Sequence, residues 1–448
     1  MIIHLIIIFF FVFSGIGVFY LLKNKSYKWV ALLIPSVIIY CYYIGWLFLI
    51  VLLMTLYTYL TSLYLENNRK SLIPLKYYTI VILTFLPLIF FKLNEAVTIQ
   101  LISNVSFLGL SFITFNCLSY LIDIKKGYLK PEPNFLLLLL FICFYPHILA
   151  GPLHKVKFLL PQFRNISIMA NNISLGCRLI LWGIFKKYVI AQNLAITVSS
   201  ILDKPENHLN INLLIGGTIF FFQIYCDFSS YVDIIKGVSK IFNIDLKTNF
   251  KDRIYLANSR QAFWSGWHIT LNNWFRNYVF YAIAKNYKKQ WQLDVVTIFT
   301  FILIGLWHGF AFSFVLWGLV NGIWFITEKY AKKHFEWIPV LIRNYLGILY
   351  HITISSMVAL LFRSQSIVKS MNSLFDFNEL KINKIDISVG AIISFIIMDS
   401  LYRYANGKPI EVFIGNFSTS QRWALYFVLT FAIITWQIGE SDFYYFKF

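Results

Sequence analysis

Residues 304–322 read IGLWHGFAFSFVLWGLVNG and place one histidine, His308, inside sequence that otherwise has the composition of a membrane interior. Ionisable side chains at membrane depth are costly, so they usually face the inside of a helix bundle or a water-filled cavity and mark a path for reaction or transport. His308 is therefore a candidate functional residue. The stretch also holds two pairs of glycines four residues apart, Gly305 with Gly309 and Gly318 with Gly322. This spacing lets helices pack closely, which explains the glycines but not the imidazole.

The rest of the chain has the same membrane character. Of its 448 residues, 58% are hydrophobic, 19% aromatic and 13% charged, whereas about 25% of the residues in a soluble domain are charged. Apolar runs of about 20 residues, long enough to cross a bilayer, recur from end to end with short polar intervals between them. We therefore predict an all-α polytopic integral membrane protein in which residues 1–448 form one domain. It would have roughly 10–12 transmembrane helices, together with re-entrant or interfacial helices.

The formal net charge of +19 is best explained by membrane topology. A nucleic-acid-binding protein gathers its basic residues on one soluble face, but here most of them lie between the apolar runs, as in loops that stay in the cytoplasm. No nucleic-acid partner is predicted. Residues 1–22 are expected to be a retained span, and the lysines that follow place the N-terminus outside the cytoplasm. The long basic interval 233–289 is expected on the cytoplasmic side of the membrane or in its interface.

The cysteines and the motifs favour no metal or hydrolase chemistry. The five cysteines are single and widely spaced in apolar sequence, so we expect buried small residues rather than metal ligands. The sequence contains no HExxH motif, no GxSxG nucleophile elbow and no P-loop signature. Metal-dependent proteolysis, serine hydrolysis and nucleotide hydrolysis therefore have no support, and no metal site is predicted.

A second histidine lies in residues 259–281, which we predict to form one helix with an aromatic face and a polar face. His268 lies at the border between the two faces. Such a helix suits either the membrane interface, with His268 bonded to a neighbour, or the wall of a polar cavity. A neutral imidazole in a desolvated site can accept a proton, which suits a general base that activates a hydroxyl group.

Three other polar features lie close to apolar runs. Residues 145–163 contain three prolines, which exclude one regular helix; they form either a re-entrant segment beside a site or a plain surface loop. Asp227 and Asp399 are carboxylates at the depth of expected spans. For both, an ion pair with a lysine or arginine that holds helices together is the favoured interpretation.

Two motif-bearing segments resemble the membrane-bound O-acyltransferases. They are QAFWSGWHITLNNWFRNY at 261–278 and GLWHGFAFSFVLWGLVNG at 305–322, and AGPLHKVKFLLPQF at 150–163 is also similar. The resemblance covers nearly the whole chain and is strongest to the bacterial branch that contains alginate O-acetylases and teichoic acid D-alanyl transferases. The order of these segments along the chain and the spacing between them together make the resemblance specific.

The resemblance implies a helical bundle around a central tunnel, which an acyl donor enters from the cytoplasmic side and an acceptor hydroxyl from outside. His308, in the WHG motif, would be the catalytic residue, with His268 as its partner. This chain departs from many relatives at Ser265 and Gly266, at Asn277, and at Asn321, where relatives often have a third histidine.

We therefore predict an enzyme that moves a small acyl group, acetyl before others, to hydroxyls of an extracytoplasmic polysaccharide or cell-envelope glycan. No cofactor is bound, and the donor is acetyl-CoA or an acyl-carrier thioester. Alternatives are D-alanyl transfer from a carrier-protein thioester, a transporter or flippase, and a membrane scaffold. Expected partners are membrane lipids and either a separate extracytoplasmic transferase or an acyl carrier protein, at the inner (cytoplasmic) membrane of a bacterium. Beside the two histidines, the predicted substrate-binding residues are Trp307, Trp264, Trp267, Asn272, Arg276 and Asp227.

Overall fold

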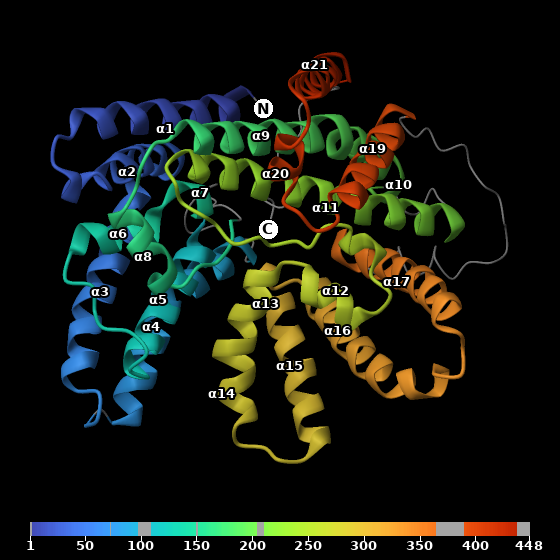
Figure 1. Ribbon diagram of the computed structural model, residues 1–448. Coiled ribbons are helices and arrows are strands. Elements are labelled where there is room, and N and C mark those ends of the chain that lie inside the picture. Colours follow the sequence, from blue (N-terminus) through green and yellow to red (C-terminus); the bar gives the residue numbers. More distant parts are fainter. Residues whose placement is uncertain are drawn as a thin grey trace. The chain divides into compact units, whose positions relative to one another are not determined.

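The computed structural model describes residues 2–71, 73–96, 109–148, 151–203, 210–363 and 389–436. All regular structure within these ranges is helical, which confirms the prediction of an all-α protein (Figure 1). The chain divides into two compact units. The first comprises Met1–Ile180 with Ile235–Lys247, and the second comprises Leu181–Ile234 with Thr248–Phe448.

The first unit is built from the N-terminal helices. In it α1 packs along α2, and α3 packs against α5 and α6. Its aromatic core includes Phe11, whose ring centroid lies 5.3 Å from that of Tyr145 and 5.9 Å from that of Phe242. The helices are α1 (Ile2–Leu21), η1 (Lys25–Tyr27), α2 (Val30–Ile44), η2 (Gly45–Leu47), α3 (Phe48–Asn67), α4 (Pro74–Ala96), α5 (Leu110–Lys125), α6 (Phe135–Cys143), α7 (Tyr145–Ile148), α8 (Val156–Arg164), and parts of α9 (Ala170–Phe185) and α11 (Asn210–Ile241).

The second unit holds the first part of α11, up to Ile234, and the end of α9, together with helices that lie before and after α11 in the sequence. Helices α15 and α16 form a tight hairpin, and α17 packs on α16 (Figure 1). The remaining helices are η3, a π-helical turn (Lys186–Ala191), α10 (Gln192–Leu202), η5 (Ile254–Leu256), α12 (Arg260–Gly266), α13 (Ile269–Phe275), η6, also π-helical (Arg276–Phe280), α14 (Tyr281–Ala284), α15 (Gln290–His308), α16 (Phe312–Ala331), η7 (Lys332–Phe335), α17 (Val340–Arg363), α19 (Val389–Ala405), α20 (Ile410–Gly415) and α21 (Thr419–Trp436).

The chain is a multi-pass membrane protein. Within the described residues, five helical segments are long and apolar enough to cross a bilayer: Lys25–Asn67, Pro74–Asn94, Ile211–Ile241, Gln290–His308 and Val340–Arg363. Some expected spans are shorter helices, such as α6 with 9 residues, and others fall partly outside the described ranges. The larger number of 10–12 spans that hydropathy suggests therefore stays a prediction.

The close packing of α15 on α16 requires glycine at the positions where the sequence predicts close helix contacts. A Cβ added to Gly305 would lie 2.1 Å from the Phe314 carbonyl oxygen, and one added to Gly318 would lie 2.4 Å from the Phe301 carbonyl oxygen. Helix backbones that approach so closely leave no room for a side chain. The packing role predicted for this glycine spacing is thereby confirmed.

The prediction of one helix over 259–281 is wrong. Helix α12 ends at Gly266 and α13 begins at Ile269. Between them Trp267 is extended and His268 has a left-handed backbone, with φ of 43°. The chain therefore forms two short helices with a break at Trp267 and His268.

The break is stable because nearby groups satisfy the backbone atoms that it frees. Lys251 N–H donates to the Gly266 carbonyl at 2.9 Å, and Ile269 N–H donates to the Asn249 carbonyl at 2.9 Å. The Asn249 side chain also accepts from Thr270 N–H at 3.2 Å. Buried backbone polar groups need such partners. These partners lie about 20 residues upstream, where a helical periodicity cannot reveal them.

Two smaller expectations are decided. Residues 145–163 are broken as predicted, with α7 and α8 separated by an irregular segment; residues 149–150 lie outside the described part, and whether the segment borders a site stays open. Three of the five cysteines are buried, but Cys41 and Cys177 are exposed, which corrects the expectation for those two. Cys41 lies on α2 and Cys177 on α9.

Candidate active site

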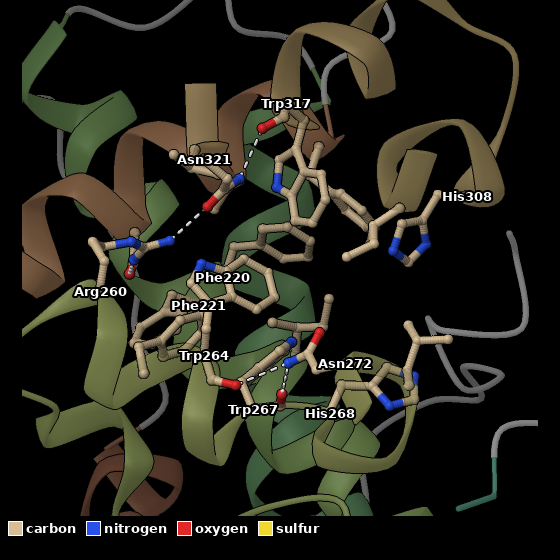
Figure 2. A pocket seen from close by; sticks show the side chains of 18 residues that line it. Phe220, Phe221, Arg260, Trp264, Trp267, His268, Asn272, His308, Trp317 and Asn321 are labelled. Carbon is tan, nitrogen blue, oxygen red and sulfur yellow. Dashed lines mark hydrogen bonds between the residues drawn. The ribbon is translucent and has the colours of Figure 1, made fainter. Parts of the chain in front are cut away.

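A cavity of about 80 Å³ lies in the second unit, among α11, α12, α13, α15, α16 and α17. Its wall is mostly aromatic and aliphatic. Both predicted catalytic histidines, His308 and His268, line it, and Figure 2 shows their imidazole rings on the same side of the pocket. A mostly apolar pocket with a few convergent polar groups is the usual form of a small-molecule site.

His308 is the last residue of α15, and its side chain is buried. The ring centroid lies 4.9 Å from that of Phe362, 5.6 Å from that of Trp317 and 6.0 Å from that of Phe314. These rings come from α16 and α17, so three helices fix the orientation of the imidazole. Gly309 follows directly and ends the helix, which places His308 at a helix terminus on the pocket wall.

Trp307 links the two histidines. Its ring centroid lies 4.5 Å from that of His308 and 6.2 Å from that of His268, although its side chain is not part of the pocket wall. His268 also packs edge-on against Phe228, with 4.8 Å between ring centroids. Burial lowers the pKa of His268 to about 3, so its imidazole is neutral at physiological pH.

Asn272, Trp264 and Trp267 line the pocket as well. The amide nitrogen of Asn272 donates to the carbonyl of Trp264 at 2.9 Å and to that of Trp267 at 2.6 Å (Figure 2). An amide has two N–H donors, and both are used here to satisfy the end of α12. Asn272 therefore holds the backbone before His268 in place, and its amide oxygen is the atom that remains to contact a ligand.

Arg276 and Asp227 are not part of the pocket wall. Arg276 lines a neighbouring cavity of about 450 Å³, which shares Trp264 and Asn272 with the first. The carboxylate of Asp227 lies 2.7 Å from Lys187 Nζ, and both side chains are buried. The ion pair expected for Asp227 is confirmed, as is that of Asp399, whose carboxylate accepts from Arg253 at 2.8 and 3.1 Å.

Arg260 completes the polar part of the pocket. Its side chain is 1% exposed. Nη2 donates to Asn321 Oδ1 at 2.6 Å, and Nη1 donates to Ser355 Oγ at 2.8 Å and lies 3.2 Å from His351 Nδ1. Burial lowers the pKa of Arg260 to about 10, so the guanidinium remains charged at neutral pH. In the described part of the chain, no group of three or more His, Cys, Asp or Glu side chains could hold a metal ion.

Residues 36–362 match the family model described as membrane-bound O-acyltransferase. The chain belongs to the membrane-bound O-acyltransferase family. Within the match lie both histidines and every other residue of the pocket wall.

Similarity to individual proteins is more specific than the match to the family model. The chain is 32% identical over 222 residues to a probable alginate O-acetylase of Pseudomonas putida, which covers 50% of this chain and 45% of the relative. It is 32% identical over 243 residues to a peptidoglycan O-acetyltransferase of Helicobacter pylori, covering 48% and 46%. It is 28% identical over 253 residues to a teichoic acid D-alanyltransferase of Bacillus subtilis, covering 52% and 62%. The alignments thus span about half the length of these relatives.

The pocket of this family member combines predicted and unpredicted residues. Sequence reasoning found His308, His268, Trp264, Trp267 and Asn272 from the family motifs. It did not predict a cluster of polar side chains that three helices contribute to the pocket wall. A single polar residue in an apolar run was the available signal, but such residues are also common in helix packing. The polar residues of the wall that were not predicted to bind substrate are Arg260, Ser355 and Asn321, of which the sequence singled out Asn321 only as a departure from relatives.

Proposed function

We propose that this protein transfers a small acyl group, acetyl before others, from a thioester donor to a hydroxyl of a cell-envelope glycan. The observation that carries the proposal is that His308 and His268, the two histidines of the family motifs, line one mostly apolar pocket. Two relatives, a probable alginate O-acetylase and a peptidoglycan O-acetyltransferase, support acetyl as the acyl group and a glycan as the acceptor.

His308 is the proposed general base. Its imidazole takes the proton of the acceptor hydroxyl while the hydroxyl oxygen attacks the carbonyl carbon of the thioester. A C–O ester bond forms, the C–S bond breaks, and the proton passes from His308 to the departing thiolate. The aromatic wall excludes water, which protects the thioester from hydrolysis.

The other predicted residues have supporting roles in this proposal. The neutral ring of His268 has one N–H, which can donate to the oxyanion that develops on the carbonyl. Trp264 and Trp267 pack against the acyl group or the sugar, and Trp307 keeps the two imidazoles at a fixed separation. Arg276 in the neighbouring cavity is proposed to contact the donor. Asp227 contacts no bound molecule in this scheme, because its carboxylate is paired with Lys187.

The proposed setting is the cytoplasmic membrane of a bacterium, with the N-terminus outside. Acetyl-CoA or an acyl-carrier thioester approaches from the basic cytoplasmic side, and the glycan approaches from the other side through a tunnel. In this scheme no cofactor stays bound. A separate extracytoplasmic transferase or an acyl carrier protein is a proposed partner.

Deletion of the gene tests the proposal. The envelope glycans of the deletion strain, the wild type and a complemented strain are analysed for ester-linked acetyl and ester-linked D-alanine side by side. We expect the acetyl esters of one glycan to disappear on deletion and to return on complementation. Unchanged acetyl and D-alanine in the deletion strain would refute acyl transfer.

D-alanyl transfer is the second candidate, because a teichoic acid D-alanyltransferase is among the relatives. Selective loss of D-alanine in the deletion strain would support it over acetyl transfer. A transporter or flippase would instead change the side of the membrane on which a glycan is found, without changing its ester content.

A further inference from the structure

The Arg260 guanidinium is a buried positive charge whose hydrogen-bond partners are uncharged side chains. Its hydrogen-bond partners are Asn321 from α16 and Ser355 and His351 from α17. The Phe263 ring lies beneath it, 4.8 Å from the guanidinium carbon, and adds a modest cation–π attraction. In most proteins a buried arginine is paired with a carboxylate.

No such carboxylate is present here. Among the residues that the structure describes, no ion pair includes Arg260. Glu328 lies near, but its oxygens accept from the backbone N–H of Arg260 at 2.7 and 3.0 Å, where the carboxylate stabilises the start of α12. Within the same described residues, Nε–H of Arg260 also has no hydrogen-bond acceptor. The guanidinium is thus incompletely bonded; Glu328 attracts it electrostatically, but no carboxylate of the described residues forms an ion pair with it.

Arg260 and His308 lie at opposite sides of the pocket, with the aromatic wall between them (Figure 2). A group bound at Arg260 is therefore remote from the atoms that react at His308. The proposed function brings a glycan hydroxyl to His308, so a second part of the same glycan can reach Arg260.

We propose that Arg260 binds an anionic group of the glycan acceptor, a carboxylate or a phosphate, while the acceptor hydroxyl lies at His308. This inference rests on the proposed function, because it assigns the acceptor to this pocket. A guanidinium suits such a ligand, since its planar fork of N–H donors matches the spacing of carboxylate and phosphate oxygens. An anion would also supply the ion-pair partner that the described residues do not.

A purely structural role for Arg260 is the competing explanation, because its side chain connects α12 with α16 and α17. The two explanations differ in one measurable property. A structural residue affects the binding of neutral and anionic glycans equally, whereas an anion-binding residue affects only the anionic ones.

The test measures binding to the purified full-length protein, without an acyl donor. The probes are three trisaccharide-sized molecules: a glucose trimer, a galacturonic acid trimer and a glycerol phosphate trimer. We expect one of the two anionic probes to bind the wild type at least tenfold more tightly than the glucose trimer, and its binding to weaken with salt. Tighter binding of the galacturonic acid trimer would identify a carboxylate as the group that Arg260 binds. Tighter binding of the glycerol phosphate trimer would identify a phosphate.

Two variants remove the free charge in different ways. Arg260→Gln deletes it, and Asn321→Asp leaves the arginine but puts a carboxylate 2.6 Å from Nη2 with almost no change in shape. Both are expected to abolish the preference for the anionic probe, whereas Arg260→Lys retains part of it. Arg343→Gln, the same substitution at a half-exposed arginine of α17 outside the pocket, is the matched control and should leave the preference unchanged.

Equal binding of all three probes to the wild type would overturn the proposal, and so would an unchanged preference in a folded Arg260→Gln or Asn321→Asp protein. If Arg260→Gln does not fold, Asn321→Asp still decides. Since no acyl transfer is measured, failure of the proposed function would appear separately, as unchanged glycan esters in the deletion strain.

Discussion

His268 combines a left-handed backbone, a buried neutral ring and a place on the pocket wall. A non-glycine residue in the left-handed region costs free energy, and the surrounding structure must hold it there. Here Asn249 and Asn272 do so, by bonding to the backbone on either side of the break between α12 and α13. The precise direction of this imidazole thus depends on two asparagines, neither of which carries the proposed chemistry.

Asn272→Ala tests this dependence. The substitution leaves the Trp264 and Trp267 carbonyls without their donor, which costs about 1–3 kcal/mol for a buried acceptor. We expect a lower thermal unfolding midpoint in detergent and reduced acyl transfer. Asn273→Ala, which removes only a bond to the exposed Arg276, is the control and should change stability little. Equal midpoints for the two variants would contradict the capping role.

The buried neutral state of His268 predicts a pH dependence of stability. The pKa in the folded protein is about 3, below the unfolded value of 6.5, so between these values the unfolded chain binds more protons. The contribution of the neutral His268 ring to the free energy of unfolding is therefore present above pH 6.5 and is lost as the pH falls. At pH 5 the free energy of unfolding is lower by about 2 kcal/mol. His268→Asn keeps a residue type that tolerates the left-handed backbone and cannot titrate.

The measurement is thermal unfolding of wild type and His268→Asn between pH 5 and 8. The difference in stability between the two proteins should shift in favour of the variant as the pH falls. A difference that stays constant over this range would show that His268 does not titrate as burial predicts.

The pocket residues divide into those that sequence reveals and those that only the fold reveals. His308 stood out because an imidazole is costly in apolar sequence, and the WHG and WH motifs located both histidines. Arg260 was missed because its partners, Asn321 and Ser355, are 61 and 95 residues away. A single sequence contains no signal for such pairings.

Among the helices, the α15–α16 hairpin carries His308 and sets its position. Gly318 faces the Phe301 carbonyl, and Gly305 faces that of Phe314. Glycine spacing in the sequence predicted this contact. The break between α12 and α13 was not predictable in the same way, because helical periodicity continues through it while the bonds that stabilise it come from a distant segment.

Gly318→Ala tests the hairpin. The added methyl group would lie 2.4 Å from a backbone oxygen, and since backbone cannot rotate away, the helices must separate. We expect a loss of about 1–3 kcal/mol and weaker acyl transfer, as His308 shifts with α15. Gly17→Ala in α1, where an added Cβ meets no atom within 4 Å, is the control and should be neutral or slightly stabilising. A Gly318→Ala protein with wild-type stability would contradict the close approach.

The buried ion pair between η3 and α11 gives a second test at this scale. Lys187→Met would leave the Asp227 carboxylate buried without its cation, at a cost of about 3–5 kcal/mol. The double variant Lys187→Met/Asp227→Leu should recover most of this loss, since two apolar side chains replace two paired charges. Stability is measured by unfolding in detergent.

The same double variant decides the role of Asp227. If the carboxylate is purely structural, the recovered protein keeps its acyl transfer. A stable double variant without transfer would instead support the substrate-binding role predicted for Asp227 from the sequence.

For the whole molecule, composition and hydropathy were sufficient to predict a helical multi-pass membrane protein. Five segments of the described chain meet the length and apolarity of a span. Hydropathy could not predict how the apolar runs divide into helices: α11 continues for 32 residues, whereas α6 has 9 residues and is followed by α7 with 4.

Ester-linked acetyl on the envelope glycan of a strain that carries His308→Ala tests the central claim most directly. The comparison strains carry the wild-type gene and His334→Ala, which replaces an exposed histidine of η7 outside the pocket. All three proteins should be present at equal levels in the membrane. We predict that His308→Ala abolishes the acetyl ester while His334→Ala retains it in full. Wild-type acetyl content in the His308→Ala strain would contradict the assignment of this pocket as the site of acyl transfer.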